Sequence, residues 1–161
     1  MIIRLALPAV LALLLLAGCD RTPGETATAG FHPLTGYDPQ RDASADLKAA
    51  LGEAARTERK VLVFVGGQWC SWCRRLDALF DSDQELSAVR DRYYVALKIN
   101  WSKENRNEEV LARFPKIPGY PHLFVLAADG RLLHSQDTAE LEAGDGHDRQ
   151  KVLEFLMRWS G

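Results

Sequence analysis

Two cysteines separated by two residues, Cys70 and Cys73, are the residues of this sequence best suited to chemistry. They stand in the stretch Gly-Gly-Gln-Trp-Cys-Ser-Trp-Cys-Arg-Arg at residues 66–75. A thiolate is both a nucleophile and a metal ligand. The pair could therefore exchange disulfides, bind a soft metal ion, or form a short structural disulfide.

The pair lies where a predicted strand passes into a predicted helix. Residues 60–65, Lys-Val-Leu-Val-Phe-Val, are a run typical of a strand buried on both faces, and two glycines follow it. A cysteine in the first turn of a helix faces unpaired N–H groups and the positive end of the helix dipole, which stabilise a thiolate. We therefore expect Cys70 to attack partner sulfurs. Cys73, one turn further in, is expected to resolve the mixed disulfide.

Two other interpretations of the pair remain open, although a redox pair is favoured. A structural disulfide across two residues closes a very small loop and constrains little of the entropy of the unfolded chain. A zinc site usually has four ligands, and the sequence has no second cysteine pair. His134 and His122 could contribute to a metal site. A copper-binding or copper-delivery module using Cys70, Cys73 and His122 is therefore the alternative function from a different class.

The predicted elements that position the pair follow one another in an alternating order. Helices are expected at residues 45–55, 70–80, 83–92, 105–114 and 152–159, and strands at 60–65, 93–99, 122–127 and 131–134. Ser44 is the expected N-cap of the first helix. This order predicts an α/β fold, in which a mixed central sheet is covered by helices on both faces.

A second motif, Ile-Pro-Gly-Tyr-Pro-His at residues 117–122, places Pro121 at the start of a predicted strand. Together with Trp-Cys-Ser-Trp-Cys and the element order, this motif makes residues 45–161 resemble the thioredoxin superfamily. The resemblance is greatest to thioredoxin-like lipoproteins of the bacterial envelope and to the C-terminal thioredoxin-like domain of the transmembrane thiol–disulfide interchange protein. It implies a thioredoxin fold in which Pro121 is a cis-proline opposite the cysteines and Tyr120 faces the substrate.

The sequence departs from thioredoxins at two places. Thioredoxins carry a buried acid six residues before the first cysteine, as proton acceptor for the resolving thiol, and Phe64 occupies that position here. Another group or water must then take the proton of Cys73, or turnover is slower. The Ser-Trp dipeptide also replaces the Gly-Pro of thioredoxin, so the reduction potential does not carry over. Values in this superfamily span roughly −270 to −120 mV.

Further side chains complete the predicted site. Trp69 and Trp72 flank the motif and are expected to form a packing and docking surface, while Arg74 would favour the Cys70 thiolate if its side chain points back toward the motif. His122 could relay a proton or tune Cys70. In the alternative interpretation it is a partly exposed strand residue with neither role. We expect no organic cofactor.

Residues 1–18 have the layout of a lipoprotein-type signal peptide. Arg4 precedes an apolar run at residues 5–17, which is too short for an ordinary membrane-spanning helix. The stretch Leu-Ala-Gly-Cys at residues 16–19 resembles the lipobox of bacterial lipoproteins, in which the cysteine is lipidated. A lipidated Cys19 would leave Cys70 and Cys73 as a single pair in an exported protein.

The remaining sequence divides into a tether and a domain. Residues 19–43 are rich in Thr, Pro, Gly and Ala and predict a flexible lipid-anchored tether, and residues 44–161 predict the thioredoxin-like domain. Asp20 resembles an inner-membrane retention signal, with the domain in the periplasm. The net charge of −2 gives no basic excess for binding nucleic-acid phosphates.

The sequence therefore predicts an envelope thiol–disulfide oxidoreductase that acts on protein thiols and disulfides. A redox partner must recycle the cysteine pair. A modest preference for a reductase rests on the resemblance alone. A non-catalytic interaction domain with the same fold is a third interpretation, suggested by Phe64.

Overall fold

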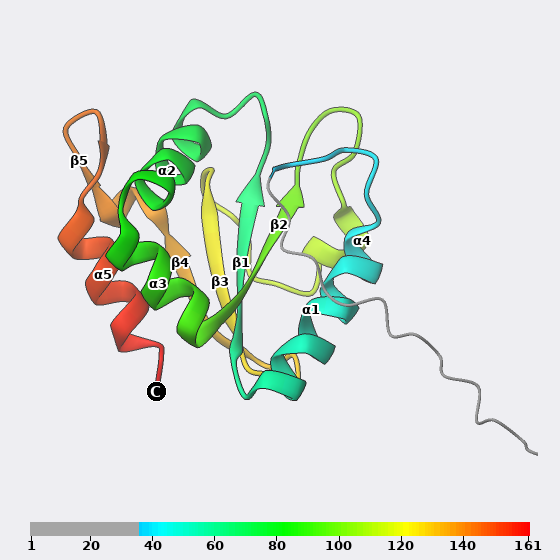
Figure 1. The fold of residues 1–161 in the computed structure, drawn as a ribbon. Coiled ribbons are helices and arrows are strands. Elements are labelled where there is room, and N and C mark those ends of the chain that lie inside the picture. The colour runs from blue at the N-terminus through cyan, green and yellow to red at the C-terminus, as the bar shows by residue number, and fades with distance from the viewer. Residues whose placement is uncertain (1–35) are drawn as a thin grey trace, which may run out of the picture.

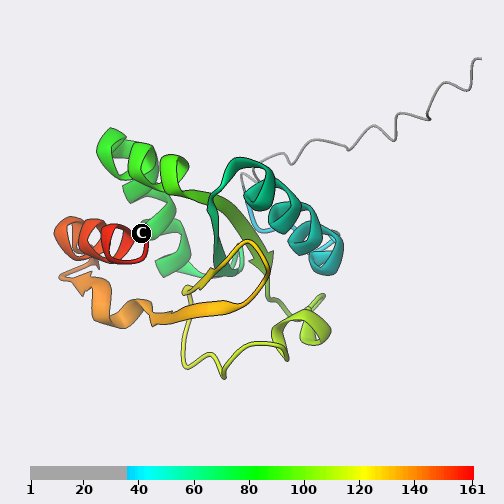
Figure 2. The same cartoon turned by 90° about the horizontal axis from the view of Figure 1, so that it is seen from below.

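A computed structural model describes residues 36–161 of the chain as a four-stranded sheet between two layers of helices (Figures 1 and 2). The predicted signal peptide at 1–18, Cys19, Asp20 and the tether as far as residue 35 lie outside the described residues. Within residues 36–161, no helix has the length and apolar character needed to cross a membrane. The predicted α/β thioredoxin fold is confirmed.

The elements alternate along the chain as the sequence predicts. The helices are α1 (Ala43–Thr57), α2 (Ser71–Ser82), α3 (Gln84–Tyr93), α4 (Glu108–Leu111), α5 (Arg149–Arg158) and the 3₁₀ turn η1 (Thr138–Leu141). The strands are β1 (Lys60–Gly66), β2 (Tyr94–Asn100), β3 (His122–Leu126) and β4 (Leu132–Asp137), followed by a short ribbon of β5 (Glu142–Ala143) and β6 (Gly146–His147).

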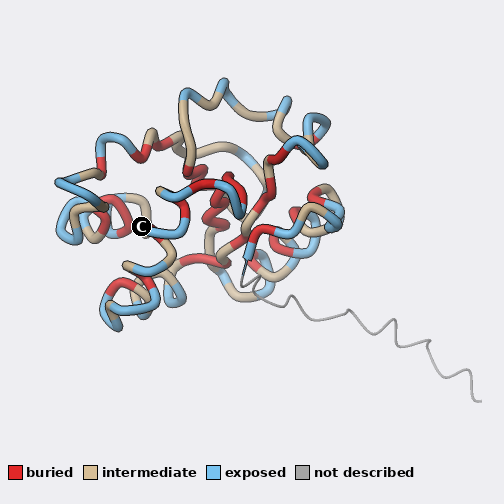
Figure 3. Tube along the Cα trace, turned by 90° about the horizontal axis from the view of Figure 1, so that it is seen from above, coloured by how far each residue is buried: buried red, intermediate tan, exposed pale blue. Residues whose placement is uncertain are grey.

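Strand β1 is a central strand of the sheet, whose order is β2-β1-β3-β4. It pairs parallel to β2 and antiparallel to β3. Its side chains alternate between two cores: Val61, Val63 and Val65 face α1 and α4, whereas Leu62 and Phe64 face α2, α3 and α5. Figure 3 shows the buried positions gathered along the sheet and the inner faces of the helices. Burial on both faces explains the continuous apolar run in the sequence.

Two local details differ from the sequence-based prediction. The N-cap of α1 is Asp42 rather than Ser44, because the Asp42 carboxylate accepts the backbone N–H groups of Ser44 (2.9 Å) and Ala45 (3.1 Å). The helix predicted at 105–114 is only the short α4. Side chains before it bond to the backbone of other segments instead: Asn107 Nδ2, for example, donates to the carbonyl of Asn100, at the end of β2, at 2.7 Å.

The folded domain begins before residue 44, where the predicted tether was expected to end. Tyr37 and Ala43 are buried. Gln68 Nε2 donates to the Tyr37 carbonyl (3.0 Å), and Asn105 Nδ2 donates to the Pro39 carbonyl (2.9 Å). The segment at 36–42 is therefore part of the domain, and it is bonded to the loop that precedes the cysteines.

The cap assignment predicts unequal effects at two neighbouring polar residues. Asp42→Ala removes the acceptor for two N–H groups and should lower the free energy of unfolding by about 1 kcal/mol, measured by urea denaturation. Ser44→Ala is the matched control and should leave that free energy nearly unchanged, because the Ser44 side chain makes no cap bond. Equal losses in the two variants would contradict the assignment.

Candidate active site

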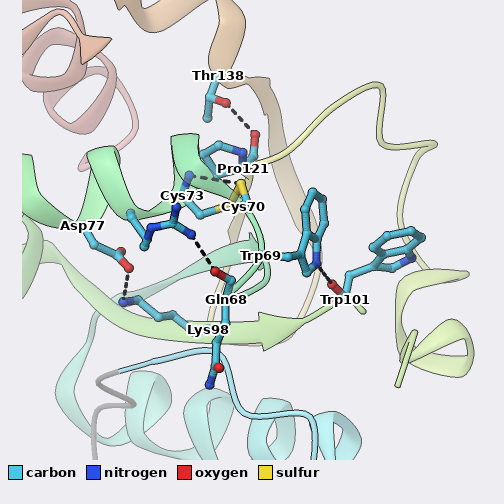
Figure 4. The surroundings of a disulfide bond; sticks show 10 residues. Gln68, Trp69, Cys70, Cys73, Asp77, Lys98, Trp101, Pro121 and Thr138 are labelled. Atoms are coloured by element: carbon cyan, nitrogen blue, oxygen red, sulfur yellow. Dashed lines mark hydrogen bonds and ion pairs between the residues drawn. A yellow bond between two sulfur atoms is a disulfide. The ribbon is translucent and has the colours of Figure 1, made fainter. Parts of the chain in front are cut away.

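Cys70 and Cys73 form a disulfide at the carboxyl end of β1, where α2 begins (Figure 4). Their Cα atoms are 5.2 Å apart. Both residues are buried, and Cys73 is only 1% exposed. The strand-to-helix placement that the sequence predicts is therefore the one observed.

The two sulfurs lie in different surroundings, which fits the predicted division of roles. Cys70 is the N-cap of α2, and its Sγ accepts the backbone N–H of Cys73 at 3.1 Å. A thiolate there would face the N–H groups of the first turn and the positive end of the helix dipole. Both cysteines belong to the apolar core that holds Leu76 and Phe80. Cys73 lies one turn inside the helix, away from the N-cap position, and there burial disfavours its thiolate.

Gly66 allows β1 and the disulfide to approach closely. A β-carbon at this position would lie 2.5 Å from Cys73 Sγ, closer than real β-carbons come to other atoms. The sulfur is held by its disulfide and cannot move aside as a free side chain could. The end of β1 therefore requires a glycine at residue 66.

Pro121 lies beside the disulfide and follows a cis Tyr120–Pro121 peptide bond, as the resemblance implies (Figure 4). Its carbonyl accepts a hydrogen bond from the hydroxyl of Thr138, which is buried and belongs to η1. This bond links the residue before β3 to the residue after β4.

Three aromatic rings form a cluster that includes the residues preceding Cys70 and Pro121. The Trp69 ring lies 5.8 Å from the Trp101 ring and 5.7 Å from the Tyr120 ring, and the Trp101 and Tyr120 rings stack at 5.0 Å. Trp69 Nε1 donates to the Trp101 carbonyl at 2.7 Å, while 54% of Trp69 remains exposed. A groove of about 470 Å³ continues from Trp101 and Tyr120 along Phe114 and Ile117. Sequence reasoning did not include Trp101 in the site, because no local pattern joins it to residue 69.

Trp72 packs against a different set of residues from Trp69. The Arg75 guanidinium lies 4.7 Å from the centroid of the Trp72 ring, and the His147 ring meets that ring edge-on at 5.5 Å. Burial and the charge of Arg75 lower the pKa of His147. Trp72 therefore joins α2 to the β5–β6 ribbon, and Trp69 is the tryptophan of the motif that faces solvent.

Arg74 points back toward the loop before Cys70. Its Nη1 donates to the Gln68 carbonyl at 2.6 Å. The side chain thus has the orientation that the predicted tuning role of Arg74 requires, although the guanidinium binds a carbonyl rather than a sulfur.

His122 faces away from the disulfide. Its ring lies 4.7 Å from that of Phe124, which belongs to the core on the α1 side, and its Nε2 bonds Ser135 Oγ at 2.8 Å. Side chains alternate along a strand, so Leu123 rather than His122 faces the core that contains Cys73. Burial lowers the pKa of His122.

The structure does not bring together the ligands of the alternative copper site. Among residues 36–161, no group of three His, Cys, Asp or Glu side chains is placed to hold a metal ion. Cys70 and Cys73 lie on the α2 side of the sheet and His122 on the other. The arrangement of the described residues thus supplies a dithiol without the imidazole that the copper interpretation needs.

Phe64 occupies the core behind the disulfide. It belongs to the same apolar cluster as Cys73, and its ring meets the Phe80 ring edge-on at 5.7 Å. A carboxylate is thus absent from this point of β1. A charged pair joins Lys98 of β2, which is in register with Phe64, to Asp77 of α2 at 2.9 Å.

The comparisons with known proteins agree with this geometry. A family model described as thioredoxin-like matches residues 42–128, more than half of the chain. The chain belongs to this thioredoxin-like family. No curated protein matches it. With a cysteine pair at the start of α2 and a cis-proline beside it, this family member is a thiol–disulfide oxidoreductase.

Solved structures with the same fold come from several bacteria. A disulphide isomerase from Xylella fastidiosa Temecula1 is 26% identical, with a TM-score of 0.69 over 78% of this chain and 96% of that one. A thioredoxin from Thermus thermophilus is 18% identical, with a TM-score of 0.53 over 69% and 81%. The oxidised DsbD C-terminal domain of Neisseria meningitidis is 20% identical, with a TM-score of 0.50 over 71% and 94%. The resemblance to the thioredoxin superfamily is confirmed.

The close approach at Gly66 predicts that Gly66→Ala is destabilising. The added methyl group meets Cys73 Sγ, so the strand or the disulfide must shift, and the oxidised protein should lose about 1–3 kcal/mol of unfolding free energy. Gly52→Ala in α1 is the control, because nothing lies within 4 Å of its β-carbon. It should gain about 0.5–1 kcal/mol. Urea denaturation of both variants tests this, and a fully stable Gly66→Ala protein would contradict it.

Proposed function

We propose that this oxidoreductase is a lipid-anchored reductase of protein disulfides in the bacterial cell envelope. The observation that carries the proposal is the position of Cys70: an N-capping sulfur at the start of α2, beside Pro121 and next to the exposed Trp69. A partner disulfide that docks on this surface meets the attacking sulfur first. Cys73, buried behind it, can reach only Cys70.

The surroundings of Cys70 favour reduction over oxidation of substrates. A pair becomes a strong oxidant when the reduced form, with its thiolate, is strongly stabilised. Here the two residues between the cysteines, Ser71 and Trp72, carry no charge, and the Arg74 guanidinium binds the Gln68 carbonyl. The start of α2 stabilises a Cys70 thiolate, and the Arg74 hydrogen bond goes to a carbonyl rather than to the sulfur.

The envelope location rests on the N-terminal sequence. Residues 1–18 have the composition of an export signal, and Cys19 stands at the position of a lipidated cysteine. Asp20 favours retention at the inner membrane, which would leave the domain in the periplasm. In that oxidising compartment, a reductase depends on a second protein that returns electrons to the Cys70–Cys73 pair.

Trapping of mixed disulfides tests the exchange reaction. In Cys73→Ala protein, Cys70 can attack a substrate but no thiol is left to resolve the product, so disulfide-linked complexes should accumulate in cells. They are detected on non-reducing gels and disappear on reduction. Cys70→Ala is the matched control and should trap none, because Cys73 is 1% exposed. Equal trapping by both variants, or by neither, would count against the assigned roles.

The steady-state redox form of the pair in cells tests the direction of electron flow. A reductase is held reduced by its donor, so alkylation of acid-quenched cells should modify both thiols in most of the protein. A purified protein with a reduction potential nearer to −270 than to −120 mV would agree with this. A pair that is mostly oxidised in cells would instead indicate an oxidase of substrate thiols.

A further inference from the structure

Tyr37, in the segment before α1, carries a buried hydroxyl that lacks a partner. The residue is 5% exposed, and among the described residues no group hydrogen-bonds to its Oη. Such a group costs free energy in a folded protein and calls for an explanation. The aromatic ring alone would fill the same space, so packing explains the ring but not the oxygen.

The hydroxyl lies next to the buried sulfur of the active site. A β-carbon built on Gly66 would lie 2.5 Å from Cys73 Sγ and 3.2 Å from Tyr37 Oη. The oxygen and the sulfur are therefore neighbours across the space that the glycine leaves open. The same glycine that permits the disulfide also permits the hydroxyl to approach it.

The position of Tyr37 is fixed from two sides. Gln68, two residues before Cys70, donates to the Tyr37 carbonyl at 3.0 Å. The Lys98 ammonium lies 5.4 Å from the centroid of the Tyr37 ring, and it pairs with Asp77 at 2.9 Å. Asp77 of α2 and Lys98 of β2 are the charged groups that share this space. Burial, and then the charge of Asp77, raise the pKa of Tyr37 well above its ordinary value, so the hydroxyl keeps its proton.

We propose that the Tyr37 hydroxyl donates a hydrogen bond to the sulfur of Cys73 when the disulfide opens. The hydroxyl would then offset part of the loss of the acid that Phe64 replaces: it lowers the free energy of the Cys73 thiolate instead of accepting its proton. This inference deepens the proposed function, because it concerns the resolving step of the same exchange.

The resolving step balances without any further reactant. Cys73 gives up its proton, and its thiolate attacks Cys70 Sγ in the mixed disulfide. The Cys70–Cys73 bond forms as the bond from Cys70 to the partner breaks. The partner sulfur leaves with the electron pair and gains a proton, so one proton is lost and one is gained. Tyr37 keeps its own proton throughout and stabilises the attacking thiolate.

The pKa of Cys73 tests this proposal without requiring any exchange activity. In the full chain with Cys19→Ser and Cys70→Ser, Cys73 is the only thiol, and its thiolate is titrated by ultraviolet absorbance. A hydrogen bond to the thiolate lowers the thiol pKa, so Tyr37→Phe should raise it by about one unit, a tenfold change in ionisation. The control is Tyr93→Phe, a partly buried tyrosine of α3 packed on the same core. A Cys73 pKa that is equal in Tyr37→Phe and the control would overturn the proposal.

The redox equilibrium with glutathione provides a second measurement. At a pH above the Cys73 pKa, Tyr37→Phe removes a bond made only to the thiolate of the reduced form, so the equilibrium should move about tenfold toward the disulfide, equivalent to about 30 mV. Oxidised Tyr37→Phe should be at least as stable as the parent, because its unpartnered oxygen is gone. Equal destabilisation of both redox forms would show a purely structural role and overturn the proposal.

The Cys73 pKa and the trapping of partners test the role of Tyr37 and the proposed function separately. If Tyr37→Phe raises the Cys73 pKa but Cys73→Ala traps no partner, the hydrogen bond stands and the proposed function fails. If partners are trapped but the Cys73 pKa is unchanged, the function stands and the role of Tyr37 is wrong.

Discussion

The burial of β1 on both faces is the constraint on which the rest of the structure depends. A strand between β2 and β3, covered by α1 on one side and α2 on the other, has no freedom to shift its register, since a shift of one residue would exchange its two buried faces. The position of Gly66 at its end is therefore fixed. Cys70, the N-cap of α2, follows four residues later, and the disulfide is placed by the strand that precedes it.

The two cysteines differ because they occupy different positions at the start of α2. Cys70 caps the start of α2, where backbone N–H groups stabilise negative charge. Cys73 is one turn deeper, among apolar side chains that disfavour charge. The Cys70 sulfur is thus suited to attack a partner, and the Cys73 sulfur is suited to resolve the mixed disulfide. The rings of Trp69, Trp101 and Tyr120 form an aromatic cluster that begins one residue before Cys70.

Sequence patterns located the parts of the site that are local and periodic. The run at 60–65, the cysteine spacing and Pro121 before a strand are each visible within a few residues, and each takes its expected place. Tyr37 was not found, because a single aromatic residue in a Thr-, Pro- and Gly-rich stretch carries no period, and its burial depends on Gln68 from a distant loop. The face taken by His122 depends on the register of β3, and the β5–β6 ribbon is too short to leave a pattern.

The replacement of an acid by Phe64 changes how the core can support a thiolate. An ionised carboxylate in the middle of the sheet would need a partner to offset its desolvation. This protein keeps its nearby carboxylate, Asp77, on α2 with Lys98 beside it, and leaves the centre apolar. A neutral hydroxyl can enter such a core at lower cost than a charge. The Tyr37 hydroxyl also keeps its proton over the whole pH range in which a carboxylate would titrate. It can therefore support the Cys73 thiolate without adding a second ionisation to the site.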